Sequence, residues 1–177
     1  MSKEIVLDEI KAIVSTTDLA GNIKYCNKYF QEVSGYEEIE LIGEPHNIIR
    51  HPDMPKVIFK LMWERIEQDK DIFAIVKNQT KNGDFYWVTT HFETKYHFLS
   101  KKRDGYFALT RAAPRQTINS IIPLYEELLK IEFNEGVQAS ENYLIDFLVA
   151  QNMDYDMYIT YIIKNKSFLD GFPKIFH

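Results

Sequence analysis

The densest group of chemically active side chains lies in one short loop, from Gly43 to Pro55. It contains three prolines, two histidines, an arginine and an aspartate. Proline fixes φ and removes a backbone donor, so Pro45, Pro52 and Pro55 prevent a long regular helix here and hold the intervening side chains at low entropic cost. Such a loop predicts one side of a binding pocket. The alternative is a rigid connector whose charged side chains are solvated.

The helix predicted after this loop is apolar around most of its circumference. Over about Met54 to Gln68, the charged residues at helical spacing form one narrow stripe: Lys56, Lys60, Glu64 and Glu67. Phe59, Trp63 and Ile66 form a separate row at i, i+4 and i+7. This row predicts either additional core or a wall for a flat aromatic ligand.

Hydrophobic alternation and turn residues predict the elements that must position these groups. Five strands are expected, at residues 12–17, 23–26, 71–79, 84–98 and 106–110. Asn27 can cap a short helix by accepting a backbone N–H, and Gly35 can end it. Asn82-Gly83 is a strong hairpin signal between the third and fourth strands. These elements predict an α+β domain, but the patterns do not give the crossover order.

Beyond residue 113 the sequence changes from strand to helix character. This change predicts a domain of residues 1–113, followed by a helical extension of residues 114–177. Apolar residues near the start of the extension recur with the 3-4 spacing of a helix that pairs with another helix: Ile118, Ile121, Tyr125 and Leu128. Pro123 fits the first turn of a helix capped by Asn119 or Ser120, where no N–H is needed.

The composition excludes several classes of protein. The 177 residues carry a net charge of −5, whereas a nucleic-acid-binding surface normally gives a basic excess. A single cysteine rules out an intramolecular disulfide and a zinc cluster of thiolates, and no metal site is expected. No apolar stretch approaches the roughly 18 residues that span a bilayer, and the start is charged, so a cytoplasmic location is expected. The sequence contains no recognisable nucleophile–base pair, nicotinamide-binding fingerprint or pair of catalytic acids. The protein is therefore not expected to be an enzyme, and no catalytic residue is assigned.

Several motifs over roughly residues 12–112 resemble a PAS sensor domain. The general PAS features are the opening hairpin, the helix start at Asn27, and the sequences Ser34-Gly35-Tyr36 and Lys81-Asn82-Gly83-Asp84 before Tyr86-Trp87. A more specific resemblance, to the aerotaxis-receptor family, is carried by Pro45-His46-Asn47 and Arg50-His51-Pro52-Asp53-Met54-Pro55, followed by Trp63 and Val76-Lys77-Asn78. Within that family the chain looks like the stand-alone, CetB-like energy-taxis proteins.

The resemblance implies the PAS fold, in which helices cover one face of a five-stranded antiparallel sheet and the family's cofactor, FAD, lies between them. Seven residues correspond by position to its flavin pocket: Asn27, Arg50, His51, Asp53, Phe59, Trp63 and Asn78. In that setting Trp63 or Phe59 would stack on the flavin ring, and the two asparagine amides would bond to its polar edges. Arg50 would bind phosphate or stabilise a reduced ring, with Asp53 either orienting Arg50 or capping the next helix. This chemistry does not distinguish FAD from FMN.

The leading interpretation is a soluble FAD-binding redox sensor for aerotaxis, or energy taxis. The resemblance also implies a partner, a membrane-bound methyl-accepting chemotaxis transducer that would hold the sensor at the inner membrane, and a homodimer is a further expectation. The main alternative is a cofactor-free PAS interaction module, in which Phe59 and Trp63 are only core residues. A second alternative is a haem sensor, with an axial ligand chosen by residue type from His46, His51, His91 and His97. A photoreceptor of the light-oxygen-voltage type is excluded because residues 47–50 contain no cysteine.

Two surfaces are candidates for carrying the signal to a partner. One is the face of the sheet on which Thr89, His91 and Glu93 are expected to be exposed. The other is the helical extension with its apolar row, suited to a helical partner or a second copy. The alternative for the extension is that it folds back over its own sheet.

Overall fold

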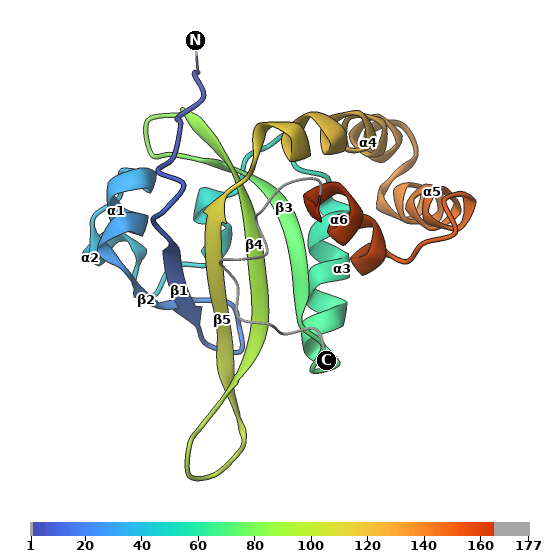
Figure 1. The fold of residues 1–177 in the computed structure, drawn as a ribbon. Coiled ribbons are helices and arrows are strands. Elements are labelled where there is room, and N and C mark those ends of the chain that lie inside the picture. Colours follow the sequence, from blue (N-terminus) through green and yellow to red (C-terminus); the bar gives the residue numbers. More distant parts are fainter. Residues whose placement is uncertain (1, 165–177) are drawn as a thin grey trace. The chain divides into compact units, whose positions relative to one another are not determined.

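One antiparallel sheet organises the computed structural model, which describes residues 2–164 of the chain. Its strands are β1 (Ile13–Thr17), β2 (Ile23–Cys26), β3 (Ile72–Gln79), β4 (Phe85–Tyr96) and β5 (Arg103–Ala112). Their order across the sheet is β2-β1-β5-β4-β3, so the last strand in sequence is the central one (Figure 1). The predicted five-stranded antiparallel α+β fold is confirmed, and the crossover order that the sequence left open is now defined.

Four short elements join the two outer strands of this sheet. They are α1 (Lys28–Ser34), α2 (Glu38–Leu41), the 3-10 helix η1 (His46–Ile49) and α3 (Lys56–Glu67). Asn27 caps α1 as predicted, because its side-chain oxygen accepts the backbone N–H of Phe30 at 3.0 Å, and Gly35 ends the helix with φ at 75°. The proline-rich loop contains only one 3-10 turn, as its prolines predict.

The strand register separates the side chains of β4 into two sets. Thr90 and Phe92 face a cavity beneath the helices, so Thr89, His91 and Glu93 lie on the opposite face of the sheet. The prediction that this second face is exposed is wrong for two of its residues, since Thr89 is 0% exposed and His91 is 2% exposed. Alternation identifies the face of a strand on which a side chain lies, but it does not show whether that face is covered.

The described residues divide into two compact units, one of 2–54 with Ile58–Ala112, the other of Pro55–Val57 with 113–164. The second unit contains the helices α4 (Arg115–Glu135), α5 (Val137–Ala150) and α6 (Tyr155–Lys164). Among the described helices, none combines the length and apolar composition that crossing a bilayer would require.

Helix α4 packs against both α5 and α6. The hydroxyl of Thr117 donates to the carbonyl of Ile162 in α6, and the hydroxyl of Ser140 in α5 donates to the carbonyl of Leu128. The predicted apolar row is almost fully buried, with Ile118 and Tyr125 each 2% exposed and Ile121 and Leu128 each 0% exposed. This row is therefore not available to a partner as the sequence suggested.

The predicted position of Pro123 in a first helical turn is wrong, because Pro123 lies inside the 21-residue helix α4. Proline removes one N–H bond and crowds the preceding turn, which disfavours a helix interior. Buried apolar residues on both sides of Pro123 keep the helix continuous, since most helical stability in proteins comes from such packing.

Candidate functional site

A cavity of about 170 Å³ lies inside the first unit, between one face of the sheet and the stretches from Pro45 to Arg50 and from Phe59 to Ile66. A cavity needs about 10–15 Å³ of such volume to hold one water molecule, so this cavity is large enough to admit a ring system. Its apolar walls come from η1, α3 and three strands and include Ile49, Phe59, Met62, Ile66, Val76, Phe92 and Ala108. A mostly apolar cavity with a few polar groups at its edges is typical of a binding site for a planar organic ligand.

Trp63 and Phe59 of α3 both line this cavity, as the row at i and i+4 predicts. The Trp63 indole packs edge-on against Tyr106, with ring centroids 5.4 Å apart and an interplanar angle of 80°. Gly21, in the β1–β2 turn with φ at 84°, is needed for this placement, since a Cβ there would lie 3.0 Å from Cη2 of Trp63. Trp63 is 36% exposed, so its ring lies at the boundary between cavity and solvent.

Arg50 supplies positive charge to the same cavity. Its guanidinium carbon lies 3.6 Å from the centroid of the Phe59 ring, and its buried Nε has no hydrogen-bond partner. Burial lowers the pKa of Arg50, but a guanidinium remains protonated at neutral pH. A backbone bridge joins Arg50 to Asn78 on β3. Arg50 is therefore next to the side-chain amide of Asn78, a residue that is only 8% exposed. The two residues together suit a ligand edge that carries oxygen atoms or negative charge.

The sequence did not identify the polar groups that β1 contributes. Ser15 and Thr17 line the cavity, and the buried Oγ1 of Thr17 has no hydrogen-bond partner. Ser15 Oγ lies 2.9 Å from Nε2 of His46, which also lines the cavity. The i, i+2 spacing of Ser15 and Thr17 shows that they share a face of β1, but only the pairing of β1 with β5 shows that this face is the ligand side.

A serine beside a histidine can also form a nucleophile–base pair, which the sequence did not reveal. Burial lowers the pKa of His46 to about 4. A histidine of this pKa is a weak base at neutral pH, because an effective general base has a pKa near the working pH. The Ser15–His46 pair is therefore better suited to binding a polar ligand edge than to activating a hydroxyl group. Of the four histidines considered as haem ligands, His46 alone lines the cavity.

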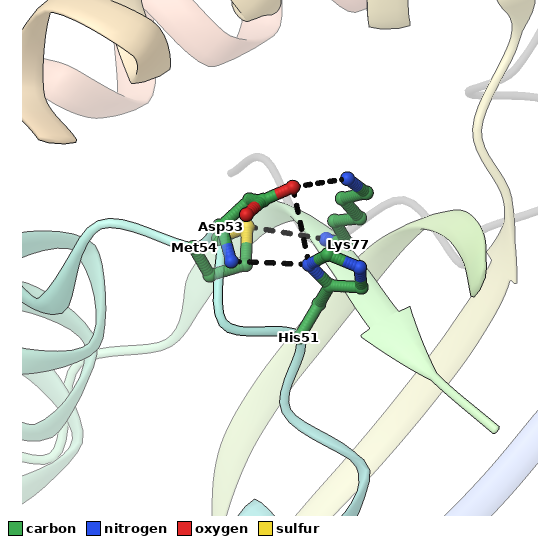
Figure 2. A network of polar contacts seen from close by, with 4 residues as sticks. All are labelled: His51, Asp53, Met54 and Lys77. Carbon is green, nitrogen blue, oxygen red and sulfur yellow. Dashed lines mark hydrogen bonds and ion pairs between the residues drawn. The ribbon is translucent and has the colours of Figure 1, made fainter. Parts of the chain in front are cut away.

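His51 and Asp53 lie outside the cavity and join the proline-rich loop to β3 (Figure 2). The Asp53 carboxylate pairs with Lys77 at 2.8 Å and lies 3.5 Å from Nδ1 of His51, which accepts the Asp53 backbone N–H at 3.0 Å. The backbone N–H of Lys77 donates to the sulfur of Met54 at 3.2 Å. The hydrogen bond from Lys77 lowers the pKa of Asp53, and burial lowers the pKa of His51. The structure thus pairs Asp53 with Lys77 and His51, and not with Arg50, which was one of the two roles that the sequence left open for it.

Asn27 is occupied by local structure and does not line the cavity. Its side-chain oxygen accepts the backbone N–H groups of Val14 and Phe30, and its amide nitrogen donates to the carbonyl of Ala12 at 2.8 Å. These bonds fix the start of α1 against β1. Of the seven residues predicted for the site, the structure brings four together in the cavity: Arg50, Phe59, Trp63 and Asn78. The other three, Asn27, His51 and Asp53, position the elements around it.

Comparison with known proteins identifies similar sequences. A family described as the PAS fold matches residues 23–106. The aerotaxis receptor of Escherichia coli (strain K12) is 41% identical over 116 residues, which cover 66% of this chain and 22% of the receptor. The bacterioopsin transcriptional activator of Halobacterium salinarum is 28% identical over 88 residues, covering 48% of this chain and 13% of that protein. The chain thus spans about a fifth or less of the length of these relatives.

Solved structures give the same fold. The PAS domain of a protein from Colwellia psychrerythraea superposes with a TM-score of 0.52 at 22% identity, covering 57% of this chain and 85% of that one. A light-oxygen-voltage domain studied with a flavin analogue superposes with a TM-score of 0.54 at 17% identity, covering 66% of this chain and 86% of that one. At these identities the similarity concerns the fold alone.

Proposed function

Because this chain carries a PAS domain related in sequence to the aerotaxis receptor, we propose that it is an FAD-binding redox sensor for energy taxis. The observation that carries the proposal is the cavity, because two of its lining residues, Arg50 and Thr17, each have a buried side-chain atom (Nε and Oγ1) without a hydrogen-bond partner. Buried polar groups are normally paired, so a ligand that bonds to these two residues would account for them.

The lining residues suit a flavin. Phe59 and Trp63 would bind its apolar ring, Asn78 and the Ser15–His46 pair would bind its polar edges, and Arg50 would bind its anionic part. When bound, FAD would supply a ring whose charge and hydrogen-bonding pattern differ between the oxidised and reduced forms. Arg50 remains a fixed cation in a partly desolvated site, so its interaction energy with the ligand differs between those two charge states. Such a difference in interaction energy is what can shift a conformational equilibrium of the protein.

The absorption spectrum of the purified protein tests this proposal directly. We expect a yellow protein that releases its chromophore on heat denaturation, and chromatography of the released flavin identifies FAD or FMN. A protein that stays colourless after incubation with either flavin would contradict the proposal and would favour a cofactor-free interaction module. A Soret band would instead indicate a haem sensor, with His46 as the residue placed to ligate the iron.

We further propose that the signal passes to a membrane-bound methyl-accepting chemotaxis transducer, which would hold this protein at the cytoplasmic side of the inner membrane. The sequence relationship to the aerotaxis receptor supports a role in chemotaxis signalling. Within the second unit, the side chains of Ile145 and Val149 remain exposed by 53% and 71%. They lie one helical turn apart on α5 and therefore share a face. This apolar pair is our candidate contact with the transducer or with a second copy of the chain.

Replacing both residues with glutamate tests this output surface. We expect Ile145→Glu/Val149→Glu protein to keep its flavin and its helix content, because both side chains are exposed, and to lose co-purification with the transducer and oxygen-directed swimming. Circular dichroism and the flavin spectrum serve as controls for folding. Normal swimming toward oxygen in cells that produce only the double variant would show that the signal leaves through another surface.

A further inference from the structure

The geometry points to a second ligand site, on the face of the sheet opposite the cavity: Asp71, His91 and Glu93 are placed to bind one divalent transition-metal ion, such as Zn²⁺ or Co²⁺. This site shares no residue with the cavity. It is independent of the proposed flavin, so it can be tested on protein with or without FAD.

The antiparallel register of β3 and β4 creates this cluster from two separate stretches of sequence. Phe73 pairs with His91 and Ile72 pairs with Phe92, so the same register places Asp71 opposite Glu93. Side chains two residues apart on a strand share a face, so His91 and Glu93 lie together on β4, beside Asp71, the residue immediately before β3. One ligand atom from each of the three side chains lies within 4.8 Å of the others.

His91 indicates that the cluster is more than a group of surface acids. Its imidazole is 2% exposed, and its Nε2 has no hydrogen-bond partner. Oδ2 of Asp71 lies 3.6 Å from Nε2, within ion-pair distance. Two ligand atoms that each lie about 2.0–2.1 Å from a tetrahedral ion are separated by about 3.3 Å, so a small side-chain rotation brings this pair to bonding distance. A buried ring nitrogen that has no hydrogen bond, and only a long ion-pair contact with one carboxylate, would gain a partner from a metal ion held between it and the carboxylates.

The surroundings of the cluster also favour a cation. Within the described part of the chain, no lysine or arginine forms an ion pair with Asp71 or Glu93, and like charges on opposed strand residues destabilise a sheet. The Phe73 ring stacks on His91, with centroids 4.5 Å apart and an interplanar angle of 23°, which fixes the orientation of the imidazole. The side chain of Asp71 is 42% exposed, which leaves the ion a route from solvent and room for a water ligand. One imidazole and two carboxylates form a ligand set of the kind that Zn²⁺ and similar first-row ions accept.

This site was not expected from the sequence, because no metal-binding motif connects Asp71 with His91 and Glu93. The three residues come together only through strand pairing. The cysteine count still excludes a thiolate site, and the site inferred here uses nitrogen and oxygen ligands alone.

Titration of the full-length, tag-free protein with Zn²⁺ or Co²⁺ tests this inference. We expect isothermal titration calorimetry to show one bound ion per chain, and Co²⁺ to give a visible absorption band of a protein-bound ion. Asp71→Asn and Glu93→Gln keep the size of each side chain at partly exposed positions, so both variants should fold. Each should weaken the metal Kd by at least about tenfold, because even residues that only support metal ligands contribute about 10–100-fold.

Matched controls separate this site from other metal-binding groups. Asp104→Asn removes an exposed carboxylate that pairs with Lys95, and His97→Gln removes a histidine near the β4–β5 turn; neither should change the Kd. In protein labelled with ¹⁵N-histidine, which contains five histidines, the ring resonances of His91 should shift on addition of Zn²⁺. A wild-type protein that binds no ion, or Asp71→Asn and Glu93→Gln variants that bind as tightly as wild type, would overturn the inference.

Discussion

Replacing Arg50 with alanine is expected to weaken FAD binding by about one to two orders of magnitude while the domain remains folded. Arg50 is the only lysine or arginine among the described residues that line the cavity, and its buried Nε has no protein partner. A hydrogen bond from a charged group contributes about 1.5–3 kcal/mol, and each 1.4 kcal/mol is a factor of ten in affinity. Trp63→Ala should have a similar effect, since stacking on an aromatic side chain contributes about 1–3 kcal/mol in nucleic-acid complexes. Fluorescence titration of apoprotein with FAD measures both losses.

Ile58→Ala is the matched control for these two variants. Ile58 is on the same helix as Trp63 and is 0% exposed, but it does not line the cavity. Truncating a buried isoleucine costs about 2–5 kcal/mol of stability, so this variant should lower the melting temperature of apoprotein and holoprotein alike. Wild-type FAD affinity in both Arg50→Ala and Trp63→Ala would show that the flavin does not bind in this cavity.

Gly105→Ala is expected to destabilise the first unit by about 3 kcal/mol or more, which is large for a single methyl group. Gly105 lies in β5 with φ at 127°, and a Cβ there would lie 1.8 Å from the backbone oxygen of Thr17 on β1. No side-chain rotation can relieve a clash with backbone, so the two paired strands would have to separate locally. The free energy of unfolding, measured by urea denaturation, should fall accordingly.

Gly43→Ala separates the cost of backbone conformation from the cost of this clash. Gly43 has φ at 90°, but no atom lies within 4 Å of a Cβ built on it. An alanine at positive φ costs about 1–2 kcal/mol, so Gly43→Ala should destabilise the protein by about that amount. An equal loss of stability in Gly43→Ala and Gly105→Ala would show that the close approach of β5 to β1 is not what requires glycine at residue 105.

Local signals predicted most of the elements of the fold. The Asn27 cap, the Gly35 end of α1 and the Asn82-Gly83 turn depend on neighbouring residues, and all three occur as predicted. Pro123 is the exception among these signals. Its effect depends on how well the rest of α4 is packed, and that packing comes from α5 and α6, which follow later in the chain.

The site was also predicted only in part, because some of its residues are positioned by neighbours in the chain and others by distant segments. The Phe59–Trp63 row lies on a single helix, and it lines the cavity as the helical period indicates. The roles of His51 and Asp53 depend on Lys77, which reaches them from β3, and Ser15 becomes a lining residue only because β1 pairs with β5. Such contacts between distant segments are not visible in the spacing of residues along the chain. The same limit applies to Asp71, His91 and Glu93, whose proximity depends on the register of β3 with β4.

The central position of β5 has a consequence for synthesis of the chain. Ile13 in β1 pairs with Thr110 in β5, so the first strand lacks its long-range partner until nearly the whole first unit has been made. At about 5–20 residues per second, translation of the intervening stretch takes on the order of 5–20 s. During this time β1 and β2 form at best an isolated hairpin, which is marginally stable in water and presents an unpaired edge. The nascent N-terminal hairpin is therefore the segment at which mispairing or chaperone binding competes with folding, and arrival of the last strand ends that competition.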